Sequence, residues 1–280
     1  MNSNVSSFYT PNSELVLERD GGCKLTVKVI QVFTPFSSSQ VSLVRLTNDI
    51  PDLPSVFIVK TFDPRFDSIR FTAKGENRWP WSLQAEAEAE DLRRRGIPKQ
   101  TEYDFPDRND PVGVEEYCFK GMDCDCSGEV EAYLRLQAFQ GHHIPKLYGE
   151  ANFITTDVRR AIIPRSLLIQ YIPNAVTIDK ISKDLVTTSL AKSFFHLLKS
   201  FHALGVIHND LHHDNILVAD SSENLQARAV FIDFGEVCLR DGETDEEWAK
   251  IVRCLGDERF MRRQLQKVLG TEDVACFIDD

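Results

Sequence analysis

Residues 206–217 of the chain read VIHNDLHHDNIL, a stretch that places three histidines, two aspartates and two asparagines between two apolar ends. Carboxylate, amide and imidazole groups are the side chains that most often bind cations and move protons in proteins. Gly205 follows an amphipathic helix expected over residues 188–203, so the polar stretch is expected to form a loop. The stretch therefore predicts a catalytic or metal-binding loop.

The residues after this loop complete a chemically meaningful set. Two short apolar runs, 216–218 and 229–232, predict strands, and Asp233-Phe234-Gly235 follows the second. Phosphoryl transfer needs a carboxylate that orients the acceptor hydroxyl and cations that neutralise phosphate charge. Asp210 suits the first task, while the oxygens of Asn215 and Asp233 suit Mg²⁺, a hard cation.

The first half of the chain supplies a candidate cationic partner. β-Branched runs at 24–33 and 40–46 predict two strands joined by a turn that contains Ser37, Ser38 and Ser39. A third strand is expected at 55–62, with Lys60 among apolar residues. Lys60 could reach nucleotide phosphates if a carboxylate held it in place. Glu131, on a helix expected at 129–139, is the first candidate for that carboxylate and Glu129 is the second.

Three further elements are expected. Residues 82–95 predict a helix with acids in its first half and arginines near its end, inside an otherwise irregular region, 63–127. Residues 165–172 predict a buried strand that leads into a connector at Pro173. Residues 245–255 predict a final helix. Its Asp245 and Trp248 are candidates to hold the polar loop in place through contacts from this helix.

Taken in chain order, these pieces resemble a protein-kinase-like phosphotransferase. The matching pieces, over about residues 25–250, are Val59-Lys60, Glu131, the hinge-like stretch 168–172, the loop 208–215 and Asp233-Phe234-Gly235. The form H-x-D-L-H-x-x-N is similar to that of aminoglycoside and choline kinases and of fungal kinase-like proteins, because His212 stands where ordinary protein kinases place a lysine.

The resemblance implies an α/β (α+β) fold of two lobes. Residues 1–172 would form an antiparallel-sheet N-lobe with a long insertion at about 63–127, and residues 173–280 a shortened helical C-lobe. It also implies ATP and Mg²⁺ as cofactors, transfer of the γ-phosphoryl group to a hydroxyl of a protein or small molecule, and adenine binding by backbone groups of Gln170 and Ile172. His208 would brace the loop and His212 would face the site.

Two departures from the family keep a second function open. The phosphate-binding turn, Phe36-Ser-Ser-Ser-Gln40, has no glycine, so close approach of its backbone to phosphate is harder. After Gly235 there are 45 residues and no A-P-E motif, which leaves little of the platform on which protein kinases bind peptides. A catalytically silent kinase-like module that binds a partner is therefore the alternative to an active kinase.

Metal binding is the other alternative considered. The imidazoles and carboxylates of the polar loop could form a transition-metal cluster, comprising His208, Asp210, His212, His213 and Asp214. That interpretation leaves Lys60 and Asp233 without a role, so phosphoryl transfer is preferred. Zinc binding by Cys118, Cys124 and Cys126 is disfavoured because the chain has no CxxC pair.

Composition restricts partners and location. The net charge of −11 disfavours binding to nucleic acid or anionic lipid. The first twenty residues resemble no secretion signal, and no run of 18 apolar residues is present. Seven cysteines without paired spacing indicate free thiols in a reducing compartment. The expected location is therefore intracellular and cytoplasmic, while the oligomeric state cannot be predicted.

Overall fold

The computed structural model describes residues 9–72, 75–97, 105–107, 109–154, 159–220 and 227–270. The chain divides into two compact units. The first unit comprises Met1–Cys126 and Leu147–Tyr171, and the second comprises Ser127–Lys146 and Ile172–Asp280. The sequence interpretation placed one division near Pro173 and did not foresee that residues 127–146 group with the second unit.

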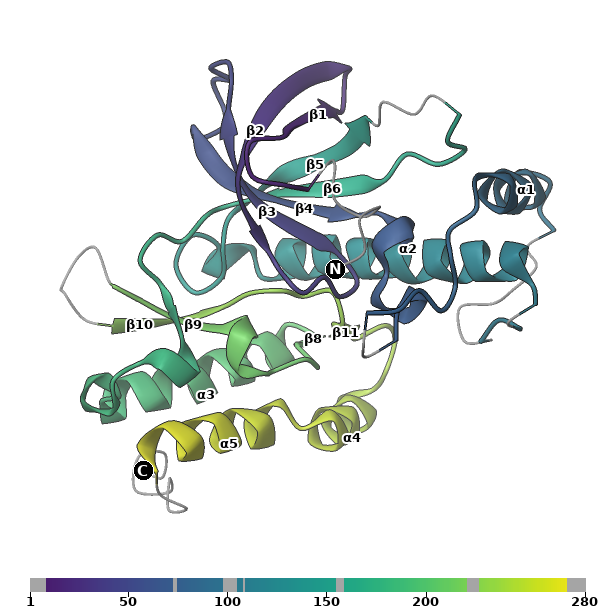
Figure 1. The fold of residues 1–280 in the computed structure, drawn as a ribbon. Coiled ribbons are helices and arrows are strands. Elements are labelled where there is room, and N and C mark those ends of the chain that lie inside the picture. The colour runs from purple at the N-terminus through teal and green to yellow at the C-terminus, as the bar shows by residue number, and fades with distance from the viewer. Residues whose placement is uncertain are drawn as a thin grey trace. The chain divides into compact units, whose positions relative to one another are not determined.

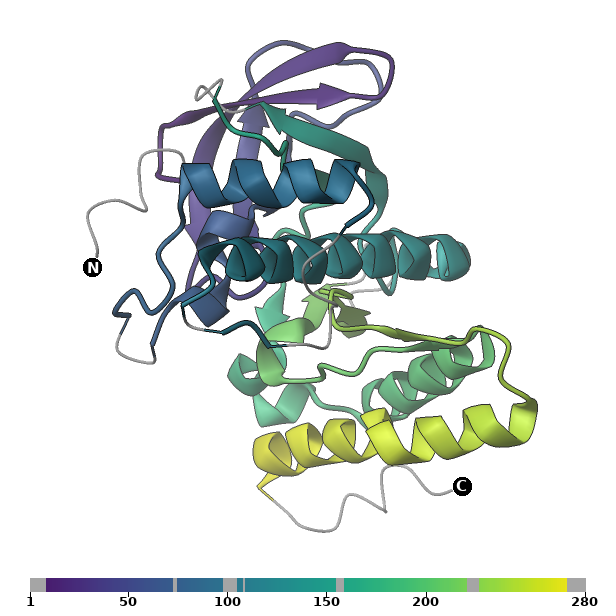
Figure 2. The ribbon, with the colours of Figure 1, turned by 90° about the vertical axis from the view of Figure 1, so that its right-hand side faces the viewer.

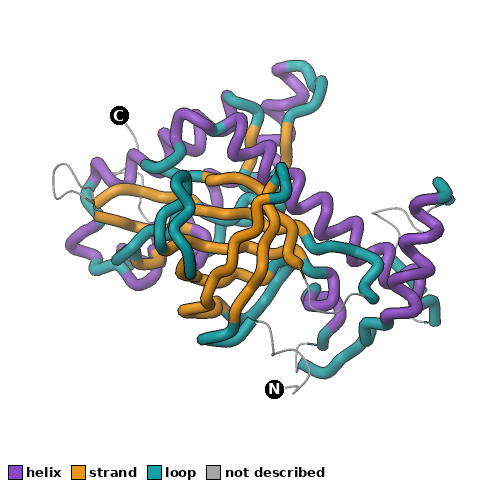
Figure 3. The backbone as a smooth tube through the Cα atoms, turned by 90° about the horizontal axis from the view of Figure 1, so that it is seen from above, coloured by secondary structure: helices purple, strands orange, loops and turns teal. Residues whose placement is uncertain are grey.

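Six antiparallel strands of the first unit form a closed barrel (Figures 1 and 3). They are β1 (Glu14–Arg19), β2 (Cys23–Phe33), β3 (Gln40–Leu46), β4 (Val56–Phe62), β5 (Leu147–Ile154) and β6 (Arg165–Ile169). Their order is β1-β2-β3-β4-β6-β5, and pairing of β1 with β5 closes the ring. The strands predicted around 24–33, 40–46, 55–62 and 165–172 are confirmed, although β6 ends at Ile169; β1 and β5 were not predicted.

Side chains at alternate positions of the strands form the core of the barrel. In β4, Phe57 and Val59 are fully buried in the core, where they join residues of the other strands such as Leu17, Val27 and Leu168. Burial of each such side chain contributes about 1.5–3 kcal/mol relative to exposure. Because both β1 and β5 are paired on two sides, the barrel leaves no open edge that could recruit another strand.

Two helices follow β4 in the first unit. The helix α1 (Leu83–Arg94) is capped by Ser82, whose hydroxyl accepts from Ala85 N at 3.3 Å, and it confirms the helix predicted at 82–95. Short 3₁₀ helices at Pro64–Phe66 and Ser68–Arg70 precede it. Figure 2 shows α1 alongside α2 (Pro111–Arg135), and Ala85, Ala89 and Val112 form a small core between them.

The length of α2 corrects the sequence prediction. The predicted helix began at residue 129 and ended at 139, whereas α2 begins at Pro111 and ends at Arg135, followed by a 3₁₀ turn at Gln137–Phe139. Gly113, Gly121 and Gly128 lie within it, and each glycine costs a helix about 1 kcal/mol relative to alanine. The predicted irregular region therefore hides a helix that tertiary packing stabilises.

Buried ion pairs attach the inserted helices to the first unit. Arg70 donates to Glu115 at 2.7 Å, with the two side chains only 1% and 4% exposed. Arg160 pairs with Glu86 at 2.8 Å and with Asp63 at 3.3 Å, all three being buried. The insertion is therefore a packed part of its unit.

The second unit combines helices with short antiparallel sheets. It contains the last turns of α2 and the 3₁₀ turn at Gln137–Phe139. Its further helices are α3 (Thr188–Ala203), α4 (Asp245–Leu255) and α5 (Asp257–Leu269), with 3₁₀ turns at Ile178–Lys180, Lys183–Leu185 and His213–Asn215. Its strands are β7 (Val176–Thr177), β8 (Val206–Ile207), β9 (Ile216–Asp220), β10 (Ala227–Phe231) and β11 (Cys238–Leu239). The order β10-β9-β7 forms one sheet, and β11 pairs with β8.

The helix α3 is the centre of the second unit (Figure 1). It confirms the helix predicted at 188–203 in both bounds. Phe194 and Phe201 pack edge-on against Phe231 of β10, with ring centroids 5.9 and 5.6 Å apart. On its other side, Phe195 lies under the guanidinium of Arg262 in α5. The predicted helix at 245–255 is confirmed as α4, whereas α5 was not predicted.

The fold is thus a mixture of helices and antiparallel sheet, as the sequence predicts. Within the described residues, no helix has both the length and the apolar character needed to cross a bilayer.

Candidate functional site

The polar loop predicted from the sequence lies in the second unit between β8 and β9, and His208 braces it from inside. The His208 ring is fully buried. Its Nε2 donates to Ile232 O at 3.0 Å, while its Nδ1 accepts from Asp210 N at 3.4 Å. His208 therefore ties the loop to Ile232, the residue that follows β10.

Asp257 anchors the same loop through its backbone. Its carboxylate accepts from His208 N at 2.8 Å, from Asn209 N at 3.0 Å and from His202 Nε2 at 3.1 Å. Burial by itself would raise the pKa of Asp257, but the His202 hydrogen bond, the nearby His208 and the loop amides outweigh it and lower the pKa below its usual value. The charged carboxylate thus holds the loop in place.

This anchor corrects the sequence interpretation, which proposed Asp245 and Trp248 as supports. Asp245 is exposed at the start of α4 and pairs with Arg240 at 2.7 Å. Trp248 donates from Nε1 to His202 O at 2.8 Å, so it is connected to the loop only through His202 and Asp257. Asp257 was missed because it begins a helix, α5, that the sequence pattern did not predict.

The catalytic candidate Asp210 lies at the surface of the loop with its side chain 42% exposed. Its Oδ2 accepts from Asn215 Nδ2 at 3.0 Å and lies 3.4 Å from His212 Nε2. Asn215 Nδ2 donates also to Asp210 O at 3.0 Å. The amide nitrogen of Asn215 is thus committed to Asp210, which leaves its Oδ1 as the atom that could take a cation.

The hairpin β9–β10 brings Asn215 and Asp233 to the same end. Ile216 pairs with Phe231, and Ile232 N donates to Asn215 O at 3.1 Å, so the two candidate metal ligands flank the hairpin's open end. Asp233 has a φ of 65°, and its Oδ1 accepts from Gly235 N at 3.3 Å. An aspartate in this left-handed conformation is uncommon and is typical of functional turns.

A stack of rings lies behind this end of the hairpin. Phe234 is fully buried, with its ring 4.9 Å from that of His208 and 5.7 Å from that of Tyr133. Tyr133 comes from the last turns of α2, which belong to the second unit. The segment Asp233-Phe234-Gly235 is therefore fixed by packing as well as by hydrogen bonds.

Two glutamates on this part of α2 have opposite surroundings. Glu131 is 43% exposed and pairs with Arg135 at 2.8 Å. Glu129 is fully buried and lies one turn from Tyr133 on the same side of the helix. Burial raises the pKa of Tyr133 well above its usual value, and the charges of Glu129 and Asp233 add to this effect. Glu129 and Asp233 are thus near enough to Tyr133 to act on it together.

In the first unit, Lys60 occupies an interior strand. In β4 it lies opposite Val41 of β3 and Leu167 of β6, and only 3% of it is exposed. Its Nζ lies 5.4 Å from the centre of the Phe62 ring. Lys60 therefore lies on a strand that is paired on both sides, not on an edge strand.

The serine turn between β2 and β3 is held by its own unit. Ser68 N donates to Ser37 O at 3.0 Å, and Phe36 packs against Phe66 with ring centroids 6.4 Å apart. Ser37 is exposed and Ser38 is half-buried, whereas Ser39 is 3% exposed. Of the three serines predicted to contact phosphate, Ser39 is thus the least accessible.

The residues predicted to bind adenine lie where the chain passes from one unit to the other. Gln170 follows β6 and is half-buried in the first unit. Ile172 begins the second unit and packs against Ala219 and Val230 of the β9–β10 sheet.

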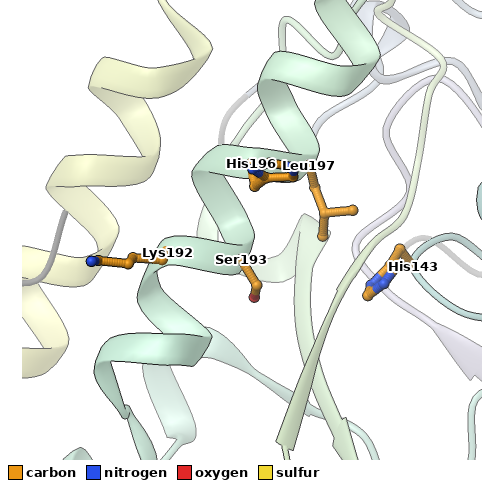
Figure 4. Close-up of a pocket in the computed structure, with 5 residues that line it drawn as sticks. All are labelled: His143, Lys192, Ser193, His196 and Leu197. Carbon is orange, nitrogen blue, oxygen red and sulfur yellow. The ribbon is translucent and has the colours of Figure 1, made fainter. Parts of the chain in front are cut away.

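A pocket of about 310 Å³ in the second unit is lined by none of the predicted residues. Its walls are His143, Lys192, Ser193, His196 and Leu197. Figure 4 shows Lys192 pointing away from His143, whose Nδ1 faces Ala229 O at 3.0 Å. The polar groups do not converge on the hollow, so we do not take it as a functional site.

No family model and no curated protein matches the chain. Among solved structures it is similar to the Rio2 kinase from Chaetomium thermophilum, alone and in an ADP/Mg²⁺–phosphoaspartate complex, at 14% identity and a TM-score of 0.48. It is similar also to the BubR1 kinase domain, at 10% identity and a TM-score of 0.46. These alignments cover 86–88% of this chain but only 54–60% of the other chains.

Proposed function

We propose that the chain is a kinase-like phosphotransferase that moves the γ-phosphoryl group of ATP to a hydroxyl. The observation that carries this proposal is the second unit's constellation of Asp210, Asn215 and Asp233, held by His208 and Asp257. Asp210 is exposed and accepts a hydrogen bond from Asn215, and Asp233 lies across the end of the hairpin from Asn215. This set of oxygen ligands and one exposed carboxylate suits phosphoryl transfer better than hydrolysis by a nucleophilic triad.

In this proposal Asp210 orients the acceptor hydroxyl and receives its proton. Its exposed carboxylate leaves room for an acceptor, and the hydrogen bond from Asn215 fixes its direction. Asn215 Oδ1 and the Asp233 carboxylate would hold Mg²⁺, which when bound neutralises phosphate charge. Both are hard oxygen ligands of the kind that Mg²⁺ prefers.

We further propose that Lys60 positions the phosphates of ATP, and that Glu129 rather than Glu131 is the acid of α2 that nucleotide turnover needs. The buried position of Glu129 beside Tyr133 supports this choice. Glu131 is exposed and already forms an ion pair with Arg135, which it would have to break to take the same role.

The test compares wild-type protein with Asp210→Asn and Asp233→Asn. We expect wild-type protein to hydrolyse or transfer phosphate from labelled ATP in the presence of Mg²⁺. Asp210→Asn should lower turnover by at least a hundredfold while nucleotide still raises the melting temperature, and Asp233→Asn should lose both effects. Asp241→Asn, an exposed aspartate after β11, is the control. Turnover in Asp210→Asn equal to that of wild type would exclude the proposed role.

A catalytically silent kinase-like module is the second candidate. The burial of Ser39, together with the hydrogen bond that joins Ser37 to Ser68, favours it because less of this turn is available to phosphate. Melting-temperature shifts with ATP and Mg²⁺ but no turnover against pools of metabolites and proteins would support the silent module. Turnover that Asp210→Asn abolishes would support the enzyme.

A further inference from the structure

Three consecutive side chains, His212, His213 and Asp214, gather next to Asp210 in the second unit. Asp214 Oδ2 lies 3.6 Å from His212 Nδ1 and 3.3 Å from His213 Nε2. One ligand atom from each residue lies within 4.8 Å of the other two. Donor atoms that share a tetrahedral Zn²⁺ at about 2.0–2.1 Å are about 3.4 Å apart, so both distances to Asp214 are close to that spacing.

The two ring nitrogens of His212 have different surroundings. Its Nδ1 accepts from Asp214 N at 3.3 Å, so the proton of the neutral ring is on Nε2. An ion bound at Nδ1 would replace this hydrogen bond, because both use the same lone pair. That Nε2 faces Asp210 Oδ2 at 3.4 Å. A histidine that binds a metal through one nitrogen usually donates from the other to a carboxylate, which orients the ring and strengthens it as a ligand. Asp210 and His212 have this arrangement.

We propose that His212 Nδ1, His213 Nε2 and Asp214 Oδ bind a divalent transition ion of the zinc class, with Asp210 as the carboxylate behind His212. The side chains are 44–60% exposed, so an ion can enter from solvent and keep open positions for water. His208 is not part of this site, because it is buried and both of its ring nitrogens have partners in the loop and β10.

This site differs in chemistry from the magnesium site proposed above. Two imidazoles and one carboxylate favour Zn²⁺, Cu²⁺ or Ni²⁺, whereas Mg²⁺ favours oxygen ligands alone. The two sites share Asp210, which bonds to Asn215 on one side and faces His212 on the other. Ion binding at His212 would draw its Nε2–H toward Asp210 and make that carboxylate a poorer proton acceptor. The metal site itself does not depend on the proposed phosphotransferase activity.

The test follows the histidine rings directly, because the free cysteines can also bind zinc. Metal-free full-length protein labelled with ¹⁵N-histidine is titrated with Zn²⁺ in excess Mg²⁺, and ring-nitrogen resonances are recorded. We expect the Nδ1 of His212 and the Nε2 of His213 to shift with a stoichiometry of one ion per chain. The described residues of α3 offer a matched control in His196, an exposed imidazole whose resonances should not move.

Variants then separate ligands from neighbours. His213→Ala and Asp214→Asn should each weaken Zn²⁺ binding at least tenfold, and Asp210→Ala should weaken it about 10–100-fold by removing the carboxylate behind His212. His196→Ala should leave the affinity unchanged. Circular dichroism of each variant checks that the fold is retained. An unchanged affinity in His213→Ala, or shifts confined to other histidines, would overturn the proposal.

Discussion

Asp257 illustrates how a single buried charge can determine the shape of a loop that it does not belong to. Its two oxygens accept three hydrogen bonds, from His202 and from two consecutive backbone amides of the polar loop. Asn209, which supplies the second of these amides, leaves regular backbone geometry with a φ of 64°. An ionised acceptor that holds two amides compensates for such an uncommon conformation.

Replacement of Asp257 by asparagine tests this role. The amide can accept fewer of the three bonds and presents a donor to another donor, so we expect a loss of about 1.5–3 kcal/mol in the free energy of unfolding at pH 7. Urea unfolding followed by circular dichroism measures it. The exposed Asp245→Asn is the matched control and should cost less than about 0.5 kcal/mol.

The free energy that Asp257 contributes to folding should depend on pH. The pKa of Asp257 lies below its usual value, so its ionised form stabilises the fold above the unfolded-state pKa of about 4. This contribution is lost as the pH falls below about 4 through the folded-state pKa. The stability difference between wild type and Asp257→Asn should therefore narrow between pH 7 and pH 3. A difference that stays constant over that range would contradict the assignment.

At the scale of elements, the sequence predicts regular segments well and the long helix poorly. The strands β2, β3 and β4 and the helices α1, α3 and α4 follow the periodicities of their residues. The helix α2 does not, because three glycines weaken its pattern and its first half is fixed by ion pairs, such as Arg70–Glu115, that no local pattern reveals. The sequence pattern also does not show that Glu129 is buried whereas Glu131 is exposed.

The paired variants Glu129→Gln and Glu131→Gln decide between the two acids. Glu129 is buried beside Tyr133, whereas Glu131 is exposed and paired with Arg135. We expect Glu129→Gln to lower kcat/KM for ATP turnover at least tenfold, equal to about 1.4 kcal/mol of transition-state stabilisation, and Glu131→Gln to change it less than twofold. A loss in Glu131→Gln as large as that in Glu129→Gln would reverse the assignment.

At the scale of the whole molecule, the order of motifs along the chain predicts a division into two parts but not where every boundary falls. Helix α2 runs unbroken across the boundary between Cys126 and Ser127, so no change in composition or breaker residue marks it. The closed barrel was also unforeseen, because β1 and β5 are far apart in sequence and only long-range pairing joins them. The polar loop between β8 and β9, in contrast, is local in sequence, so its position could be predicted.

Each unit has its own apolar core, so a buried defect in one should affect that unit first. Arg70→Met leaves Glu115 buried without its partner, and loss of one member of a buried ion pair costs about 3–5 kcal/mol. Burial already raises the pKa of the Glu115 carboxyl in spite of Arg70, so the unpaired acid has little to offset its desolvation. The double variant Arg70→Met/Glu115→Met should recover most of the loss.

Tryptophan fluorescence can report which unit responds. Trp79 and Trp81 lie in the first unit and Trp248 lies in the second. In a Trp248→Phe background, Arg70→Met should lower the urea midpoint of the fluorescence transition by the amount that corresponds to the whole loss of about 3–5 kcal/mol. In a Trp79→Phe/Trp81→Phe background, which leaves Trp248 as the probe, the same change should shift the midpoint by less than half as much. Equal shifts in the two backgrounds would mean that the units unfold as one cooperative body, so that the cores act together despite the division of the chain.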